Sequence, residues 1–335
     1  MQSVTNLIHL VLKNKLEVQP AFYLHFLRYC KFSRGAEYCL WLFGKLEEQS
    51  PSTLEDNSNI ASLLMHILSD LKMVEEAKRV FQKVKVKDTM SWNALILNHA
   101  GIGLFEECFE FVKVMEKEGI LATNTTWSII FCGLLNHPDG NVDSAMQLFE
   151  RHLRTDYASW NVLVRWLFKM GKQDEVPLYV QKMVDLNVPL QIRMWNALIE
   201  GYSDSGQTDM AEKYFKEMKD SGVKPDVITW NVLINGFLKK NQVESALKIF
   251  EEMEKSTTKP TNFTWTTLLS GLSKSSSTHF EVYLNKFKHS TVKPNVVFKT
   301  FLLKNYFKEN KISEAINAFK EIEPTTLSSK TWNTL

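Results

Sequence analysis

The chain has few of the residues that build metal sites, disulfide scaffolds and membrane spans. Its four cysteines, Cys30, Cys39, Cys108 and Cys132, include no Cys-x-x-Cys pair, which argues against a zinc site and favours buried thiols in a reducing compartment. No run of 18 uncharged apolar residues is present, so we expect no membrane span. Because the formal net charge is only +2, any nucleic-acid site must come from local placement of charge.

Catalytic patterns are also missing. The eight histidines are scattered, and the sequence contains no Walker loop, no Gly-x-Ser-x-Gly, no His-Glu-x-x-His and no zinc deaminase signature. We therefore expect these 335 residues to form a binding module without cofactor or metal. This expectation leaves open a catalytic domain beyond residue 335.

What the chain does have is a regular spacing of tryptophan. Seven of its nine tryptophans are separated by 35, 33, 35, 35, 35 and 67 residues, the last step being two periods: Trp92, Trp127, Trp160, Trp195, Trp230, Trp265 and Trp332. Most are followed by one small pattern, as in Trp195-Asn196-Ala197-Leu198-Ile199. A self-similar period of this length indicates a solenoid, in which each repeat buries its apolar face against its neighbours.

The repeat at 192–226 predicts two antiparallel helices. Trp195, Leu198, Ile199 and Tyr202 lie on one helical stripe, and Ala211, Phe215 and Met218 lie on a second, which Gly222 and Pro225 terminate. The turn between the helices carries a residue that tolerates a left-handed backbone, at Gly103, Gly140, Gly171, Gly206, Asn241 and Asn310. The second helix carries a small residue one turn before a phenylalanine, at Ala77, Ala145, Ala211, Ala246 and Ala315.

Applied along the chain, this pattern predicts an all-α fold, a right-handed superhelical α-solenoid of about nine helix-turn-helix repeats. Residues 1–57 would hold N-terminal helices and a degenerate repeat with Tyr23 at the tryptophan position, and 329–335 would begin a further, truncated repeat. Eight repeats are expected between them, at 58–88, 89–123, 124–156, 157–191, 192–226, 227–261, 262–295 and 296–328. Three of these units are short, and 124–156 has two extra residues around Pro138-Asp139-Gly140.

One family shares this pattern. The run Asp226-Val227-Ile228-Thr229-Trp230-Asn231-Val232-Leu233-Ile234-Asn235-Gly236, followed by Ala246, Phe250 and Met253, closely resembles the pentatricopeptide repeat. The resemblance covers roughly residues 58–335 and recurs eight times. The tetratricopeptide repeat is the main rival, but it has Leu-Gly after the tryptophan and a period of about 34 residues. Here the residue after the leucine is Ile, Val or Leu.

The resemblance implies binding of single-stranded RNA, one base per repeat, on organelle transcripts. In that family the fifth and last residues of each repeat contact the base edge, and the second residue sandwiches the base. The pairs implied here are Ser62 with Asp88, Asn93 with Thr123, Ser128 with Asp156, Asn161 with Gln191, Asn196 with Asp226, Asn231 with Thr261, Thr266 with Asn295, and Thr300 with Ser328. The family trend then gives the site 5′-G-Y-G-Y-U-Y-A-R-3′.

Helix geometry supports the same face independently. The fifth residue lies about 100° round the helix from the fourth, so it faces away from the core if the tryptophan faces into it. The second and fifth residues share a face. Alternatively, Asn, Ser and Thr occur here because they favour the first turn of a helix.

Sandwiching residues would be Met90, Ile228, Phe263 and Val297, with Arg193 stacking through its guanidinium, whereas Asn59, Thr125 and Ala158 depart from the apolar preference. Lysines recur eight residues after the base-reading position, at Lys169, Lys239, Lys274 and Lys308. They could contact phosphates, or they could be solvated lysines near a helix end.

Three functional classes remain from the sequence. The first is an adaptor that stabilises, processes, edits or promotes translation of an organelle transcript. The second is a structural component of a mitochondrial ribosome that contacts ribosomal RNA and ribosomal proteins. The third is a protein-binding helical scaffold. We expect a mitochondrial location, with the plastid as alternative. Lys13 and Lys15, with no acid in the first sixteen residues, are either a faint targeting signal or part of an ordinary first helix.

Overall fold

The computed structural model describes residues 57–138, 140–275 and 279–320, together with the single positions 23, 25, 27, 43 and 44. The described part of the chain is helical and contains no strand. None of its helices is both long enough and apolar enough to cross a membrane. The predicted all-α fold is therefore confirmed, and the truncated repeat at 329–335 lies outside the described residues.

The helices form consecutive hairpins. The first helix of each hairpin begins at the first residue of a unit defined above, giving α5 (Ser58–Asp70), α7 (Thr89–Ala100), α9 (Asn124–Asn136), α11 (Tyr157–Lys169), α13 (Ile192–Asp204), α15 (Val227–Lys239), α17 (Asn262–Lys274) and α19 (Val296–Lys308). The second helices are α6 (Val74–Lys83), α8 (Phe105–Lys117), α10 (Val142–Leu148), α12 (Val176–Asp185), α14 (Thr208–Asp220), α16 (Val243–Lys255), α18 (His279–Lys288) and α20 (Ile312–Lys320).

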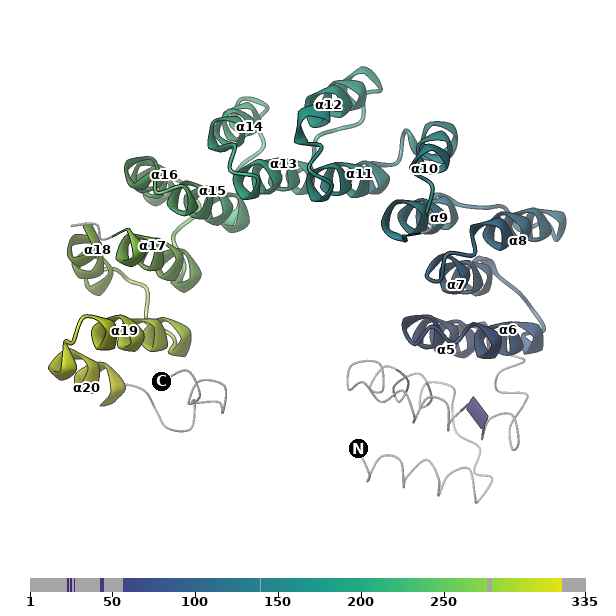
Figure 1. Ribbon diagram of the computed structural model, residues 1–335, viewed down its shortest axis with the longest axis horizontal. Coiled ribbons are helices and arrows are strands. Elements are labelled where there is room, and N and C mark those ends of the chain that lie inside the picture. Colours follow the sequence, from purple (N-terminus) through teal and green to yellow (C-terminus); the bar gives the residue numbers. More distant parts are fainter. Residues whose placement is uncertain are drawn as a thin grey trace. The chain divides into compact units, whose positions relative to one another are not determined.

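The chain divides into two compact units at Val162–Leu163, inside α11. In the first, α7 packs against α5 on one side and α9 on the other, and each of these helices packs against its own hairpin partner. In the second, α13, α15, α17 and α19 follow one another in the same way. Figure 1 shows α13, α15 and α17 as one layer of the second unit and α14, α16 and α18 as the other.

A repeated aromatic contact joins successive hairpins. In several hairpins the phenylalanine of the second helix packs edge-on against the tryptophan of the next first helix, with ring centroids 4.6 Å apart for Phe81 and Trp92, 4.9 Å for Phe215 and Trp230, and 4.7 Å for Phe250 and Trp265. All of these rings are buried, and the small residues one turn before the phenylalanines are fully buried too. Small residues beside large ones let neighbouring helices interdigitate.

Trp127 is the exception to the predicted tryptophan stripe. It is half-buried, and its ring stacks on His152 with centroids 3.9 Å apart. His152 belongs to a π-helical turn, Phe149–Leu153, that continues α10 in the unit with the extra residues. A π-helical turn carries an additional residue within the helix, so the side chains after it point in shifted directions.

Backbone geometry confirms most of the predicted turn positions. Five of the six residues named for the interhelix turn have positive φ, between 57° and 85°: Gly103, Gly171, Gly206, Asn241 and Asn310. At Gly140 the neighbouring backbone imposes the constraint. A Cβ there would lie 2.1 Å from the Leu134 carbonyl oxygen, so close backbone approach requires the glycine. Lys72, which the sequence pattern did not indicate, takes the left-handed position in the first hairpin.

Candidate nucleic-acid interface

The second residue of every repeat is exposed. Ile228, Phe263 and Val297 are 60%, 67% and 67% exposed, and Met90 is 52% exposed. Asn59, Thr125, Ala158 and Arg193 are also exposed. Contiguous exposed apolar side chains often mark an interaction site, and Ile228, Phe263 and Val297 occupy one register of three successive repeats. The first turns of the first helices therefore present a candidate binding surface.

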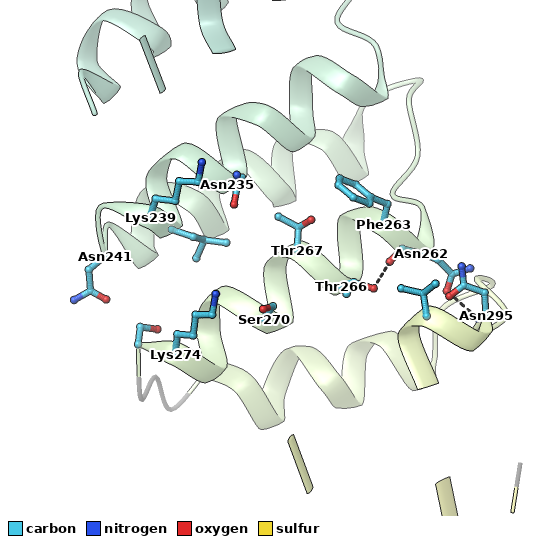
Figure 2. A pocket seen from close by; sticks show the side chains of 14 residues that line it. Asn235, Lys239, Asn241, Asn262, Phe263, Thr266, Thr267, Ser270, Lys274 and Asn295 are labelled. Carbon is cyan, nitrogen blue, oxygen red and sulfur yellow. Dashed lines mark hydrogen bonds between the residues drawn. The ribbon is translucent and has the colours of Figure 1, made fainter. Parts of the chain in front are cut away.

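Two cavities lie between successive second residues. Ile228 and Phe263 line one of about 510 Å³, together with Asn231. Phe263 and Val297 line the next, of about 740 Å³, together with Thr266 and Asn295. Figure 2 shows Phe263 and Asn295 at one end of this second cavity and Lys239 and Lys274 at the other. Each cavity thus combines apolar walls, polar amide or hydroxyl groups, and in the second case two cations.

The fifth residues are less accessible than the second. Ser62, Asn93, Asn196 and Asn231 are buried, at 0%, 9%, 9% and 7% exposure. Ser128, Asn161, Thr266 and Thr300 are half-buried. The hydroxyls of Thr266 and Thr300 donate to backbone carbonyls of their own helices, and the Asn161 amide donates to the Tyr157 carbonyl. Ser62 is therefore closed to a ligand, and the other fifth residues expose only part of their polar groups.

The last residue of most described repeats caps the next first helix. The side chains of Asp88, Thr123, Asp226, Thr261 and Asn295 all accept a hydrogen bond from the backbone N–H three residues later. Asp156 accepts from Ser159 in the same way, whereas Gln191 makes no side-chain cap. Capping alone would favour these residue types, as the alternative interpretation held. Ser328 lies outside the described residues.

The predicted pairs differ in how closely the structure joins them. Among the described pairs, only Asn196 and Asp226 are hydrogen-bonded directly, from Nδ2 to the two carboxylate oxygens at 3.3 and 3.4 Å. Ser128 is joined to Asp156 through the Ser159 hydroxyl, at 2.8 and 2.6 Å. The stacking of repeats thus brings a fifth residue beside the cap of the following helix.

Local contacts change the charge state or the charge of two groups at the candidate surface, Asp88 and Lys239. Burial raises the pKa of Asp88, but hydrogen bonds from Ser91 and Ser58 outweigh it and leave that pKa below its usual value. All four lysines at the predicted phosphate positions, Lys169, Lys239, Lys274 and Lys308, are exposed. Lys239 is not simply solvated, because its ammonium lies 2.8 Å from the Asp204 carboxylate. This ion pair weakens the cationic end of the second cavity.

Burial also favours the protonated thiol form of the two described cysteines. It raises the pKa of the Cys108 thiol to about 12, and it raises the pKa of the half-buried Cys132. Cys30 and Cys39 lie outside the described residues. Within the described residues, no three His, Cys, Asp or Glu side chains lie close enough together to hold a metal ion.

The sequence patterns overlooked one set of polar residues. The third position of a repeat carries a buried hydroxyl at Ser91, Thr126, Ser159, Thr229 and Thr264. Three of these hydroxyls contact the fifth residue of the preceding repeat: Thr126 with Asn93 at 2.7 Å, Ser159 with Ser128 at 2.8 Å, and Thr229 with Asn196 at 2.5 Å. The recurrence of Ser and Thr at this position was the signal in the sequence that could have identified them.

Comparison with known protein families agrees with this architecture. Residues 87–136, 191–237 and 225–274 match the model of the PPR repeat family. These three matches identify pentatricopeptide repeats within the chain. It is 28% identical over 148 residues to the pentatricopeptide repeat-containing protein At3g26540 of Arabidopsis thaliana, covering 34% of this chain and 21% of that protein. It is 28% identical over 120 residues to At2g22410, mitochondrial, of the same organism, covering 35% and 18%.

Among solved structures, the pentatricopeptide repeat protein PPR10 from maize matches 98% of this chain and 55% of its own, with a TM-score of 0.62 and 19% identity. This likeness shows the α-solenoid fold of pentatricopeptide repeat proteins. The matches span about a fifth of the length of the curated relatives and about half of PPR10.

Proposed function

We propose that the chain is an RNA-binding repeat protein that takes single-stranded RNA along the first turns of its first helices, one base per repeat. The observation that carries this proposal is the pair of adjacent cavities, which share Phe263 as a wall. Bases have apolar faces and polar edges, so a site with apolar walls and amide or hydroxyl groups at the side suits an unstacked base. In a duplex the base faces are stacked and the Watson–Crick edges are paired, so neither is free for such a site.

The polar residues beside the walls would read the base edge. Asn231 lines the cavity between Ile228 and Phe263, so its amide would meet the edge of the base held there. Asn196 with Asp226 and Thr266 with Asn295 would read the flanking bases. Lys274 and Lys308 would contact phosphates, with Lys239 contributing less because of its ion pair with Asp204.

The relatives support an organellar transcript as the target. Matching Arabidopsis thaliana repeat proteins carry names marked mitochondrial, as in At2g22410, or chloroplastic, as in At5g55740. PPR10 has been crystallised with an 18-nucleotide psaJ RNA element. We propose that this chain acts on organellar RNA, in stabilisation, processing, editing or translation.

The test compares a wall residue with a matched surface residue. Phe263→Ala removes the ring shared by two cavities, whereas Val282→Ala truncates a side chain of α18 that is 61% exposed and lines neither cavity. Base stacking on an aromatic side chain contributes about 1–3 kcal/mol per base, or about 5- to 150-fold in Kd. Phe263→Ala should weaken binding of the single-stranded site by that factor and Val282→Ala should not. Equal binding of duplex, or equal effects of the two substitutions, would contradict the proposal.

A further inference from the structure

The amide of Asn196 belongs to a closed ring of hydrogen bonds that links two repeats. The Asp226 backbone N–H donates to the Thr229 hydroxyl oxygen at 3.2 Å, and the Asn196 Nδ2 donates to the Asp226 carboxylate. The Thr229 hydroxyl has one hydrogen, and its shortest contact is to Asn196 Oδ1, at 2.5 Å, rather than to Asp226 at 2.9 Å. Both ends of the amide are therefore engaged.

This ring determines which way the amide points. A carboxylate only accepts hydrogen bonds, so Asp226 requires the NH₂ end of the amide, and a hydroxyl donating to the other end requires the oxygen there. Turning the amide over would break both contacts. Because Asn196 and Thr229 are buried, an unpaired amide oxygen would also lose solvation. The orientation of Asn196 thus depends on a residue of the next repeat.

The same contact occurs at some, but not all, of the repeats that are followed by a hydroxyl at the third position: Asn231 lacks it although Thr264 follows. Asn93 accepts from Thr126 at 2.7 Å, as Asn196 does from Thr229. Thr266 is followed by Phe298 at the third position, and its hydroxyl turns back to the carbonyl of Asn262 at 2.7 Å. The third residue of the next repeat therefore fixes the fifth residue's polar group only where the two are hydrogen-bonded, as they are for Asn93 and Asn196.

We propose that Thr229 is a positioning residue for base selection, which holds the Asn196 amide in the orientation that the base facing repeat 192–226 meets. This inference rests on the proposed RNA-binding function. Besides the fifth and last residues of a repeat, the third residue of the following repeat would then help to decide which base is accepted. Thr126 holds the same place for Asn93.

The chain offers a control within its own repeats. Thr264 forms the same capping box with Thr261 that Thr229 forms with Asp226, but it makes no hydrogen bond to Asn231, whose Oδ1 stays unpaired. Thr264→Val therefore removes a capping hydroxyl without releasing a fifth-residue amide. Thr229→Val removes both, and Thr229→Ser restores the hydroxyl.

The experiment measures competition among RNAs that carry A, C, G or U opposite repeat 192–226 and, separately, opposite repeat 227–261. Thr229→Val should reduce the ratio between the best and worst base at its position by about tenfold, the effect expected of one lost buried hydrogen bond. Thr229→Ser should retain most of the ratio, and Thr264→Val should leave the ratio opposite Asn231 unchanged. Equal weakening for all four bases by Thr229→Val would overturn the inference and assign Thr229 a capping role only.

A measurement without RNA separates failure of this inference from failure of the proposed function. The side-chain NH₂ signals of Asn196, assigned with Asn196→Ser, should shift and exchange faster with solvent in Thr229→Val, while those of Asn231 should not change in Thr264→Val. Unchanged Asn196 signals would refute the positioning role even if RNA binds. Changed signals in a protein that does not distinguish bases would refute the RNA-reading function and leave the ring as a link between repeats.

Discussion

Replacing Trp230 with alanine should remove one of the rings that join neighbouring repeats. Trp230 is 2% exposed, and Phe215 of the preceding hairpin packs edge-on against it at 4.9 Å. Truncating a buried tryptophan costs about 3–5 kcal/mol. About 0.5–1.5 kcal/mol of that should reflect the aromatic pair itself, so Phe215→Ala and Trp230→Ala together should cost less than the sum of the two.

Trp230→Phe provides a finer comparison. The indole Nε1 of Trp230 is buried without a hydrogen-bond partner, and phenylalanine keeps a ring at the interface without that donor. Leaving a buried donor unpaired costs about 1–3 kcal/mol, so its removal should offset part of the lost packing. Trp230→Phe should therefore destabilise the chain much less than Trp230→Ala.

The assay should report on single hairpins, because repeat arrays unfold in part locally. Urea titration gives the global effect, and hydrogen exchange of the α15 amides gives the local one. Ile228→Ala, two residues away and 60% exposed, is the matched control and should cost less than about 0.5 kcal/mol. If Trp230→Ala costs no more than Ile228→Ala, the rings do not hold the repeats together.

Acidification should destabilise the hairpin of residues 89–123. Burial lowers the pKa of His99 below its ordinary value near 6.5, and the nearby charge of Lys78 lowers it further. The hydrogen bond to the Leu95 carbonyl and the charges of Glu107 and Glu75 raise the pKa, but they do not outweigh burial. The unfolded chain then binds a proton that the folded chain does not, so this contribution is complete above about pH 6.5 and decreases below it. Urea midpoints from about pH 7.5 to about pH 5 should show the decrease, and His99→Gln should remove it. In RNA binding, Lys274→Ala should lower the salt slope by about one phosphate contact and Lys239→Ala by less, because Asp204 already neutralises Lys239; equal slopes for both variants would show that the ion pair is irrelevant.

Much of the fold follows from the sequence because stacking in a solenoid is local. The tryptophan spacing and the glycine or asparagine after most first helices are enough to place helix starts such as Val227 and turns such as Gly206, since each repeat meets only its neighbours. The exceptions lie where a local feature breaks the period. The π-helical turn that carries His152 has no simple sequence pattern, and it changes the surroundings of Trp127.

The sequence was enough to predict which positions of each repeat form the candidate site, but not which residues of neighbouring repeats contact one another there. Periodicity places the second and fifth residues on one face, and the structure exposes Phe263 and buries most of Asn196 there. Contacts between repeats escape a pattern that is read within one repeat. The ion pair of Lys239 with Asp204 joins the same position of two repeats, and the hydroxyl of Thr229 reaches back to the preceding one.

The central claim is that individual repeats select individual bases. Asn196 and Asp226 are in direct contact and should favour uracil at the fifth base of the site, so the most direct measurement is a competition series with A, C, G and U at that base. A base-edge contact discriminates by about 1–3 kcal/mol, so Asn196→Thr with Asp226→Asn should exchange uracil for adenine by about 5- to 150-fold in relative affinity. If the four bases bind alike in both proteins, this repeat is a scaffold and does not read RNA.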